Sequence, residues 1–154
     1  MFKSILVAYD GSPHARAALR QAADIARTQN ASLTVVSAWS AEFPWPATFG
    51  PAISQGAYDE FTAAVRSAAE DGLAQVASEL PEGASARTIA VEGRPANVIL
   101  DEVRSGRYDL IVMGSRGYGE AASILIGSVS HEVLHAASLP TLIVHLREDA
   151  SHQP

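Results

Sequence analysis

Residues 127–135, GSVSHEVLH, hold two overlapping patterns that indicate different chemistry. The second part, HEVLH, fits H-E-x-x-H, in which two histidines one helical turn apart bind zinc and the glutamate is the general base of a metalloprotease. The first part, Gly127-Ser128, ends a glycine spacing that suits a phosphate site. The two patterns give His131 opposite roles, as a metal ligand or as a solvent-facing residue on a helix whose first turn holds an anion.

The helix expected at 128–137 has an apolar side and a polar side. A rotation of about 100° per residue puts four apolar residues on one arc: Val129, Val133, Leu134 and Ala137. The three motif residues lie on the other: His131, Glu132 and His135. A zinc hydrolase would also need a third protein ligand, for which His145 and Glu148 are the nearest downstream candidates. We therefore expect both histidines to face water, and Val133 and Leu134 to hold the helix to the sheet.

The glycine pattern reads G-x2-G-x9-G followed by serine, and its residues are Gly114, Gly117, Gly127 and Ser128. Glycines let backbone N–H groups approach phosphate oxygens without an intervening Cβ. Ser128 begins a helix whose first N–H groups and positive dipole end face the same anion. Its hydroxyl is an extra donor, and the Ser130 hydroxyl could be another. The pattern predicts a backbone phosphate site between a strand and a helix.

This segment differs from the best-known glycine loops. It is neither a P-loop nor a Rossmann G-x-G-x-x-G, and no lysine follows Lys3. Arg116 is the only cation between residues 114 and 128, so the phosphates would rest mainly on backbone amides and bound Mg²⁺. The two ends of the segment converge only if residues 118–126 fold back, and residues 123–126 offer apolar anchors for that.

Apolar runs and helical patterns alternate along the rest of the chain. The predicted strands are residues 5–8, 33–38, 86–91, 110–113 and 142–144. The predicted helices are one that opens at Ser12-Pro13 and runs through Ala26, then 58–79, 95–104 and 128–137. This order predicts an α/β fold with a single doubly wound five-stranded parallel sheet, strand order 3-2-1-4-5, and four helices.

Ligands of such sheets bind at the carboxyl ends of the strands, where the winding reverses. The turns that follow the first and fourth strands, residues 10–12 and 114–117, would then line one crevice. The long connection at 40–56 carries three prolines and three aromatic residues. A connection of this length inside a small domain is usually a lid or a binding loop.

Composition limits the class of protein. At 154 residues the chain is expected to form one domain, residues 1–147, with a tail at 148–154. The net charge of −6 and the lack of a basic run indicate neither a nucleic-acid nor a membrane partner. The absence of cysteine and of a signal-peptide core favours a cytoplasmic protein.

Four stretches together resemble the universal stress protein family, ATP-binding branch. They are ILVAYDGS at 5–12, VEGRP at 91–95, VMGSRGYG at 112–119 and GSVSHEVLHAASLPTLIVH at 127–145. The resemblance implies a fold like that of the adenine nucleotide alpha hydrolases, and a homodimer in which the last strand, 141–145, pairs with its twin. Two features depart from the family pattern: Glu120, which would lower phosphate affinity, and segment 40–56, which matches no family motif.

The resemblance also implies a site for ATP and Mg²⁺. Ala8 and Asp10 would lie by the adenine and ribose, and Ala38 would flank the adenine. Ribose and base would be contacted by Met113, Gly114 and Arg116. The phosphates would be held by Gly117, Gly127, Ser128, Val129 and Ser130.

Three hypotheses of function follow. The first is an ATP-binding stress-response protein with at most slow hydrolysis, because no nucleophile–base pair is evident. The second is a zinc-dependent hydrolase that uses HEVLH. The third is a nucleotide-free dimer whose function is partner binding, through segment 40–56.

Overall fold

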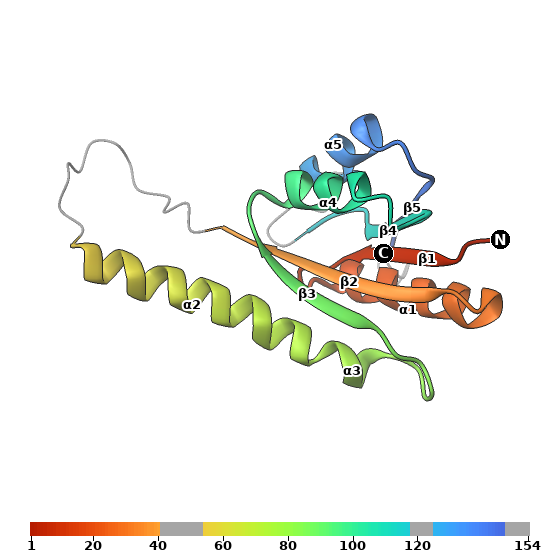
Figure 1. Cartoon of the computed structure of the whole chain (residues 1–154), viewed down its shortest axis with the longest axis horizontal. Coiled ribbons are helices and arrows are strands. Elements are labelled where there is room, and N and C mark those ends of the chain that lie inside the picture. The colour runs from red at the N-terminus through yellow and green to blue at the C-terminus, as the bar shows by residue number, and fades with distance from the viewer. Residues whose placement is uncertain (41–53, 118–124, 147–154) are drawn as a thin grey trace, which may run out of the picture.

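The computed structural model describes residues 1–40, 54–117 and 125–146. Within them, five parallel strands form one sheet in the order β3-β2-β1-β4-β5 (Figure 1). The strands are β1 Ser4–Ala8, β2 Ser32–Trp39, β3 Arg87–Glu92, β4 Leu110–Gly114 and β5 Thr141–Val144. The predicted fold class and strand order are confirmed.

Helices cover both faces of this sheet. One face carries α1 Pro13–Gln29, α2 Gln55–Ala74 and the short α3 Val76–Glu79. The other face carries α4 Pro95–Arg104 and α5 Ser128–Ala136. Strands buried on both faces are expected to be continuously apolar. β4 is an example, because each of its five residues is buried.

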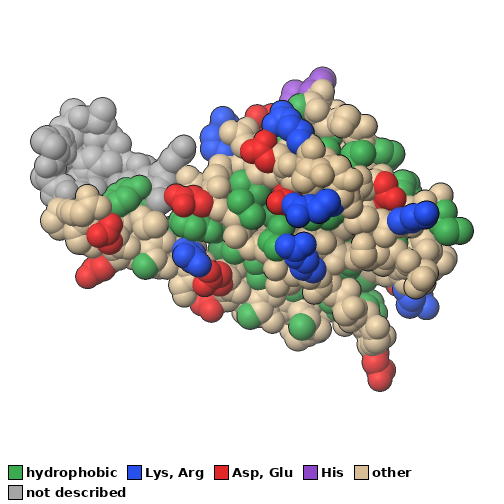
Figure 2. All heavy atoms as spheres, in the orientation of Figure 1, with side chains coloured by type: hydrophobic (Ala, Val, Ile, Leu, Met, Phe, Trp, Pro, Cys, Tyr) green, Lys and Arg blue, Asp and Glu red, His purple; other side chains and the backbone are tan. Residues whose placement is uncertain are grey.

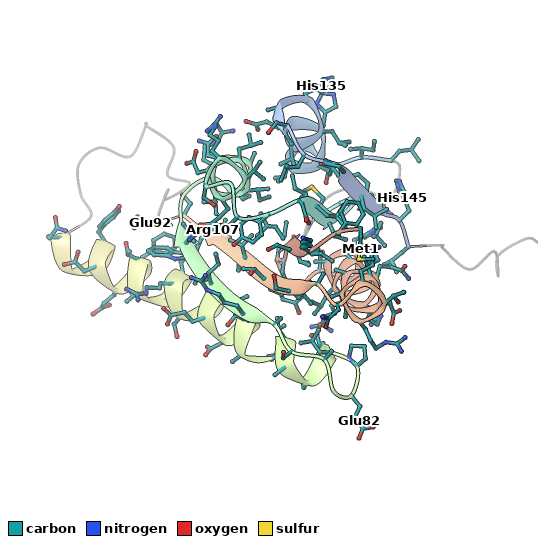
Figure 3. The ribbon with its side chains drawn as sticks, turned by 45° about the vertical axis from the view of Figure 1, so that its right-hand side comes forward. Met1, Glu82, Glu92, Arg107, His135 and His145 are labelled. Atoms are coloured by element: carbon teal, nitrogen blue, oxygen red, sulfur yellow. The ribbon has the colours of Figure 1, made fainter. Side chains whose placement is uncertain are left out.

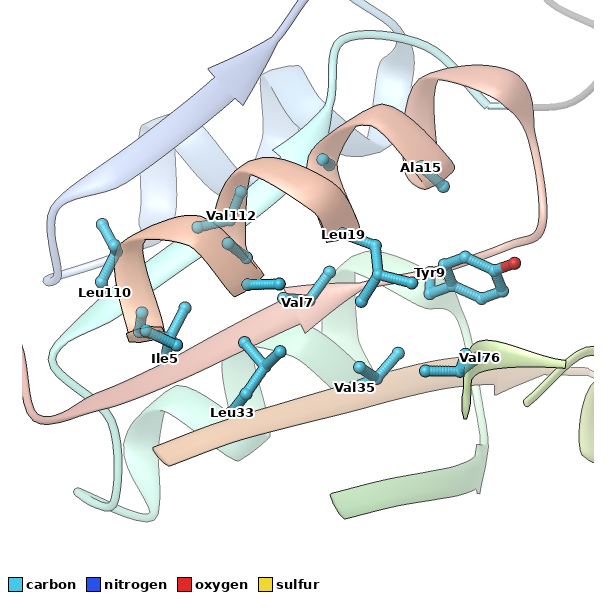
Figure 4. Packing of buried hydrophobic residues seen from close by; sticks show 14 of the residues in the cluster. Ile5, Val7, Tyr9, Ala15, Leu19, Leu33, Val35, Val76, Leu110 and Val112 are labelled. Atoms are coloured by element: carbon cyan, nitrogen blue, oxygen red, sulfur yellow. The ribbon is translucent and has the colours of Figure 1, made fainter. Parts of the chain in front are cut away.

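The sheet divides the apolar core into two layers. Ile5 and Val7 of β1 pack under α1, whereas Leu6 between them packs on the opposite face with α4 and α5. Figure 4 shows the first layer, in which Leu19 of α1 meets Val7 and Val35. The buried face of α1 otherwise consists mostly of alanines. These small side chains allow the helix backbone to lie close to the strands beneath it.

The helix predicted at 58–79 differs from the observed structure at its start and in its continuity. The helix begins earlier, at Gln55, because the Ser54 hydroxyl accepts a hydrogen bond of 3.3 Å from the Ala57 amide and caps the first turn. It is interrupted at Gln75, so the predicted helix corresponds to α2 and α3. Among the described residues, no helix combines the length and apolar character needed to cross a membrane.

The parallel register brings three strand ends together. Val7 of β1 is level with Val112 of β4, and Ala8 is level with Val36 of β2. The carboxyl ends of β1, β2 and β4 therefore form one edge, and α1 and α5 are the next helices along the chain after β1 and β4. The fold thus places the two predicted turns on a common crevice.

Candidate functional site

A cavity of about 380 Å³ opens at this edge of the sheet. All but one of the predicted site residues line it: Ala8, Asp10, Ala38, Met113, Gly114, Arg116, Gly117, Ser128, Val129 and Ser130. Gly127, the exception, is the N-cap residue of α5 and directly precedes Ser128. Residues that are distant in the sequence are thus gathered around one space, whose volume lies within the range typical of small-molecule sites.

The inner part of the cavity is an apolar slot. Its walls are Ala8 at the end of β1, Val36 and Ala38 of β2, and three residues of the first turns of α4, which are Pro95, Val98 and Ile99. Sequence reasoning missed Val36 and the α4 residues as site residues. The sequence signal for the α4 residues was the apolar side of the helix that follows VEGRP. This signal was ambiguous, because an apolar helix face can line a ligand slot or pack in the core.

Two hydrogen bonds close the glycine segment on itself. The Gly127 amide donates to the Ser115 carbonyl at 2.6 Å, and the Ser130 hydroxyl donates to the Gly114 carbonyl at 2.8 Å. They fix the start of α5 beside the end of β4, as a shared site requires. Because the Ser130 hydroxyl is buried and gives its hydrogen to Gly114, the prediction that this hydroxyl donates to phosphate is wrong. Ser130 offers its backbone N–H instead.

Gly114 is required by packing against α1. A Cβ on Gly114 would lie 2.7 Å from the backbone carbon and from the Cβ of His14. Any side chain would therefore push the first turn of α1 away from β4. A Cβ on Gly117 would lie 2.8 Å from Oδ2 of Asp10, the movable end of a side chain. Gly114 is thus needed for the packing of α1 against β4, whereas a side chain at Gly117 would displace only the carboxylate of Asp10.

The loop between β1 and α1 satisfies its own hydrogen-bonding groups. Oδ1 of Asp10 accepts the Ser12 amide at 2.9 Å, and the Ser12 hydroxyl accepts the Ala15 amide at 3.2 Å. Gly11 between them has a φ of 77°, a conformation that favours glycine. The start of α1 is therefore capped by the chain itself.

The start of α5 is built differently. Its N-cap residue is Gly127, and no side chain among the described residues caps it. The His131 amide donates to the Gly127 carbonyl at 2.9 Å and makes the first bond of the helix. The amides of residues 128–130 precede His131 in the chain, so no carbonyl of the helix itself accepts their hydrogens. All three residues line the cavity. The positive end of a helix dipole therefore faces the cavity mouth.

Tyr9 fastens the end of β1 to a neighbouring helix. Its hydroxyl donates to the Glu79 carboxylate of α3 at 3.0 Å, and Nε of Arg16 lies 3.3 Å from the same carboxylate. Burial, together with the Glu79 carboxylate, raises the pKa of Tyr9 to about 12. Tyr9 thus stays neutral and holds the strand end that carries Asp10.

The HEVLH segment lies on the outer side of α5. His131 and His135 are exposed, as predicted, with ring centroids 4.5 Å apart. Oε2 of Glu132 lies 3.9 Å from the guanidinium of Arg94, the N-cap residue of α4. The described residues contain no group of three or more histidine, aspartate or glutamate side chains that could hold a metal, so the zinc-hydrolase hypothesis lacks its third ligand there. Glu148 lies outside the described residues.

Two predictions about apolar contacts are wrong. Leu134 was expected to hold α5 to the sheet, but it is 40% exposed and Val133 alone in that pair is buried. Leu125 and Ile126 were expected to anchor the glycine segment, but they are 79% and 39% exposed. The other residues proposed as anchors, 123 and 124, lie outside the described residues, as do segment 41–53 and the tail 147–154.

Known proteins match the chain over nearly its whole length. A family described as the universal stress protein family matches residues 1–145. A universal stress protein of Thermus aquaticus is 37% identical over 144 residues, which cover 94% of this chain and 99% of that protein.

Solved structures share the architecture. Universal stress protein UspA from Lactobacillus plantarum aligns with a TM-score of 0.75 and 25% identity, over 92% of this chain and 97% of that one. A universal stress protein in complex with cAMP aligns with a TM-score of 0.59 and 24% identity, over 94% and 97% of the two chains. At 24% identity, the likeness to the protein solved with cAMP shows a shared fold.

Proposed function

We propose that this chain, which belongs to the universal stress protein family, binds ATP with Mg²⁺ as a signal in the cytoplasmic stress response. One observation carries the proposal. The cavity of about 380 Å³ is lined by the apolar slot and by a helix start that no side chain caps in the described residues. The flat base of a nucleotide would match the apolar slot, and its anionic phosphates would match the helix start.

The slot suits an aromatic base. Ala8, Ala38 and Val36 are small or β-branched, so they leave room between the sheet edge and α4. The relative solved with cAMP holds an adenine nucleotide on the same fold, which guides the choice of adenine for this chain. Met113 and Arg116 lie at the same cavity and would contact base and ribose.

The mouth suits the phosphates. Backbone N–H groups at a helix start bind anions through hydrogen bonds and the helix dipole. Here residues 128–130 supply such groups, and Gly117 brings further backbone close to the same space. Mg²⁺ prefers oxygen ligands. Asp10 carries the one carboxylate among the described residues that line the cavity, so it would hold the ion with the phosphates.

Hydrolysis is expected to be slow at most. Fast hydrolysis needs a group positioned to activate water beside the terminal phosphate. Asp10 is the carboxylate available, and its Oδ1 already accepts the Ser12 amide. We therefore propose a binding protein whose bound nucleotide persists.

Equilibrium titration with ATP and with GTP, each with Mg²⁺, tests the proposal. We expect ATP to bind and GTP to bind at least about tenfold more weakly, because the slot accepts adenine. Ala38→Leu should fill the slot and weaken ATP binding. Ala64→Leu on the exposed side of α2 is the matched control and should leave it unchanged. Absence of ATP binding by the unaltered chain would overturn the proposal and favour the nucleotide-free interaction protein.

We also propose a homodimer through β5. β5 is at the edge of the sheet, so one side of its backbone has no partner strand among the described residues. Leu142 on this strand is 37% exposed, and Leu134 on α5 is 40% exposed. Sedimentation should show a dimer that Leu142→Lys dissociates and that Tyr58→Lys, at an exposed position of α2, leaves intact. A monomeric unaltered chain would contradict the dimer.

A further inference from the structure

His131 and His135 have no part in the proposed nucleotide site, although they are placed together. They are one helical turn apart on α5, and both are exposed. Figure 2 shows histidine side chains standing out from the surface over this helix, and Figure 3 shows His135 on its outer side. We propose that these two side chains form a surface site for one Zn²⁺ ion.

The ring geometry suits a chelate. The two ring centroids are 4.5 Å apart and the planes are tilted by 59°. Imidazole nitrogens bind zinc at about 2.0–2.1 Å, so two neighbouring rings reach one ion with changes of side-chain rotamer alone. Because both rings lie in solvent, the ion keeps its remaining ligands as water, and no charge is buried.

The surroundings separate this site from a zinc hydrolase. Glu132, the general base of the H-E-x-x-H pattern, forms an ion pair with Arg94, the N-cap residue of α4. The described residues supply no third histidine or carboxylate to the pair. Zn²⁺ would thus be held by two protein ligands on a convex surface, where it binds without a substrate cleft.

The position on the helix favours a cation. α5 has nine residues, and His135 lies in its last turn, where the carbonyl ends of the helix dipole attract positive charge. A bound ion would also clamp two successive turns of a short helix. Zinc should therefore stabilise α5. Imidazole selects zinc, copper and nickel over magnesium, so the site is chemically distinct from that of a nucleotide-bound Mg²⁺.

Calorimetric titration of the nucleotide-free protein with Zn²⁺ tests the proposal. We expect one ion per chain, and a rise in the thermal midpoint on addition of Zn²⁺. His131→Ala and His135→Ala should each weaken binding at least about tenfold, since even loss of an outer-shell partner costs that much. The matched control is His145→Ala, at an exposed histidine beyond the end of β5 that Figure 3 shows away from α5.

The imidazole signals in NMR give an independent readout. Zn²⁺ should shift the resonances of His131 and His135 and leave those of His145 in place. The proposal is overturned if the single variants at residues 131 and 135 bind as tightly as the unaltered chain, or if the control variant is the one that loses the ion. Because nucleotide is absent, this result is independent of whether ATP binds.

Discussion

The starts of α1 and α5 occupy equivalent places and are built in opposite ways. Each helix follows a central strand, and each reaches the same cavity. At α1 the Ser12 hydroxyl accepts the Ala15 amide, and Asp10 accepts the Ser12 amide. At α5 the cap is Gly127, and no side chain caps the helix among the described residues.

The difference shows that a helix dipole alone does not define the proposed phosphate site. Both helices present a positive end to the cavity. At α1 the side-chain oxygens of Asp10 and Ser12 accept the amides of Ser12 and Ala15. The start of α1 therefore serves to fasten the helix to the sheet. At α5, residues 128–130 line the cavity, and their amides precede the His131 amide, which donates the first hydrogen bond of the helix. The first helix start is thus structural, and the second is the candidate for binding.

The largest expected effect is on the packing of α1. Gly114→Ala would place a Cβ 2.7 Å from the backbone of His14, so α1 or β4 must shift. Overpacking of this kind typically costs about 1–3 kcal/mol, and the rigid backbone contact favours the upper end. Urea denaturation measures the loss.

Gly72→Ala is the matched control for that substitution. Gly72 is inside α2 and a Cβ there would meet no atom within 4 Å. Alanine should stabilise the helix by about 0.5–1 kcal/mol. If both variants lost stability equally, the close contact between Gly114 and α1 would be refuted.

The second prediction concerns the internal cap of α1. Ser12→Ala removes the acceptor of the Ala15 amide and should lower the free energy of unfolding by about 1 kcal/mol. ATP affinity of the folded protein should stay within about twofold, a change well under 1.4 kcal/mol, because the start of α1 is not part of the proposed phosphate site. A large loss of ATP affinity with unchanged stability would reverse the roles assigned to the two helices.

The third prediction is a pH dependence at the end of β1. The pKa of Tyr9 is raised from 10.0 to about 12 in the folded chain, so its contribution to stability is complete below pH 10. As pH rises from 10 to about 12, the unfolded chain loses this proton first, and the contribution disappears. Unfolding curves of Tyr9→Phe and the unaltered chain should therefore converge over that range. Parallel curves would show that Tyr9 is not held neutral by burial and Glu79.

The sheet and the position of the cavity could be predicted because both depend on local pattern. Continuous apolar runs such as residues 110–113 are typical of strands buried on both faces, and β4 is buried throughout. Turn residues after the first and fourth strands indicated the crevice. Strand order then determined that they meet.

The errors concern side chains whose environment depends on tertiary packing. Helical periodicity put Val133 and Leu134 on one arc, but α5 contacts the core through a narrower face and leaves Leu134 exposed. The carbonyl of Gly114 that accepts the Ser130 hydroxyl is 16 residues away in the chain, so no local pattern could reveal it. The same holds for the contact of Gly114 with His14.

One helix boundary was predictable in principle. Ser54 is a residue type preferred at helix N-caps, and it caps α2, which begins at Gln55. The preceding prolines led to the interpretation that the loop extends to residue 56. Residues 41–53 themselves lie outside the described part of the chain, so the predicted lid stays a prediction.

The most direct test of the central claim is ATP binding by Ser128→Asp. Ser128 is exposed at the first position of α5, where a carboxylate should stabilise the helix by about 0.3–1 kcal/mol. The same charge would repel phosphates at a cost of up to about 4 kcal/mol at a separation of 4 Å, so the ATP dissociation constant should rise at least about tenfold.

Ser67→Asp adds the same charge to an exposed position of α2 and should leave ATP binding unchanged. The account predicts that calorimetry will find unimpaired stability with weakened ATP binding in Ser128→Asp alone. Equal ATP affinity in Ser128→Asp, Ser67→Asp and the unaltered chain would show that the start of α5 does not hold the phosphates.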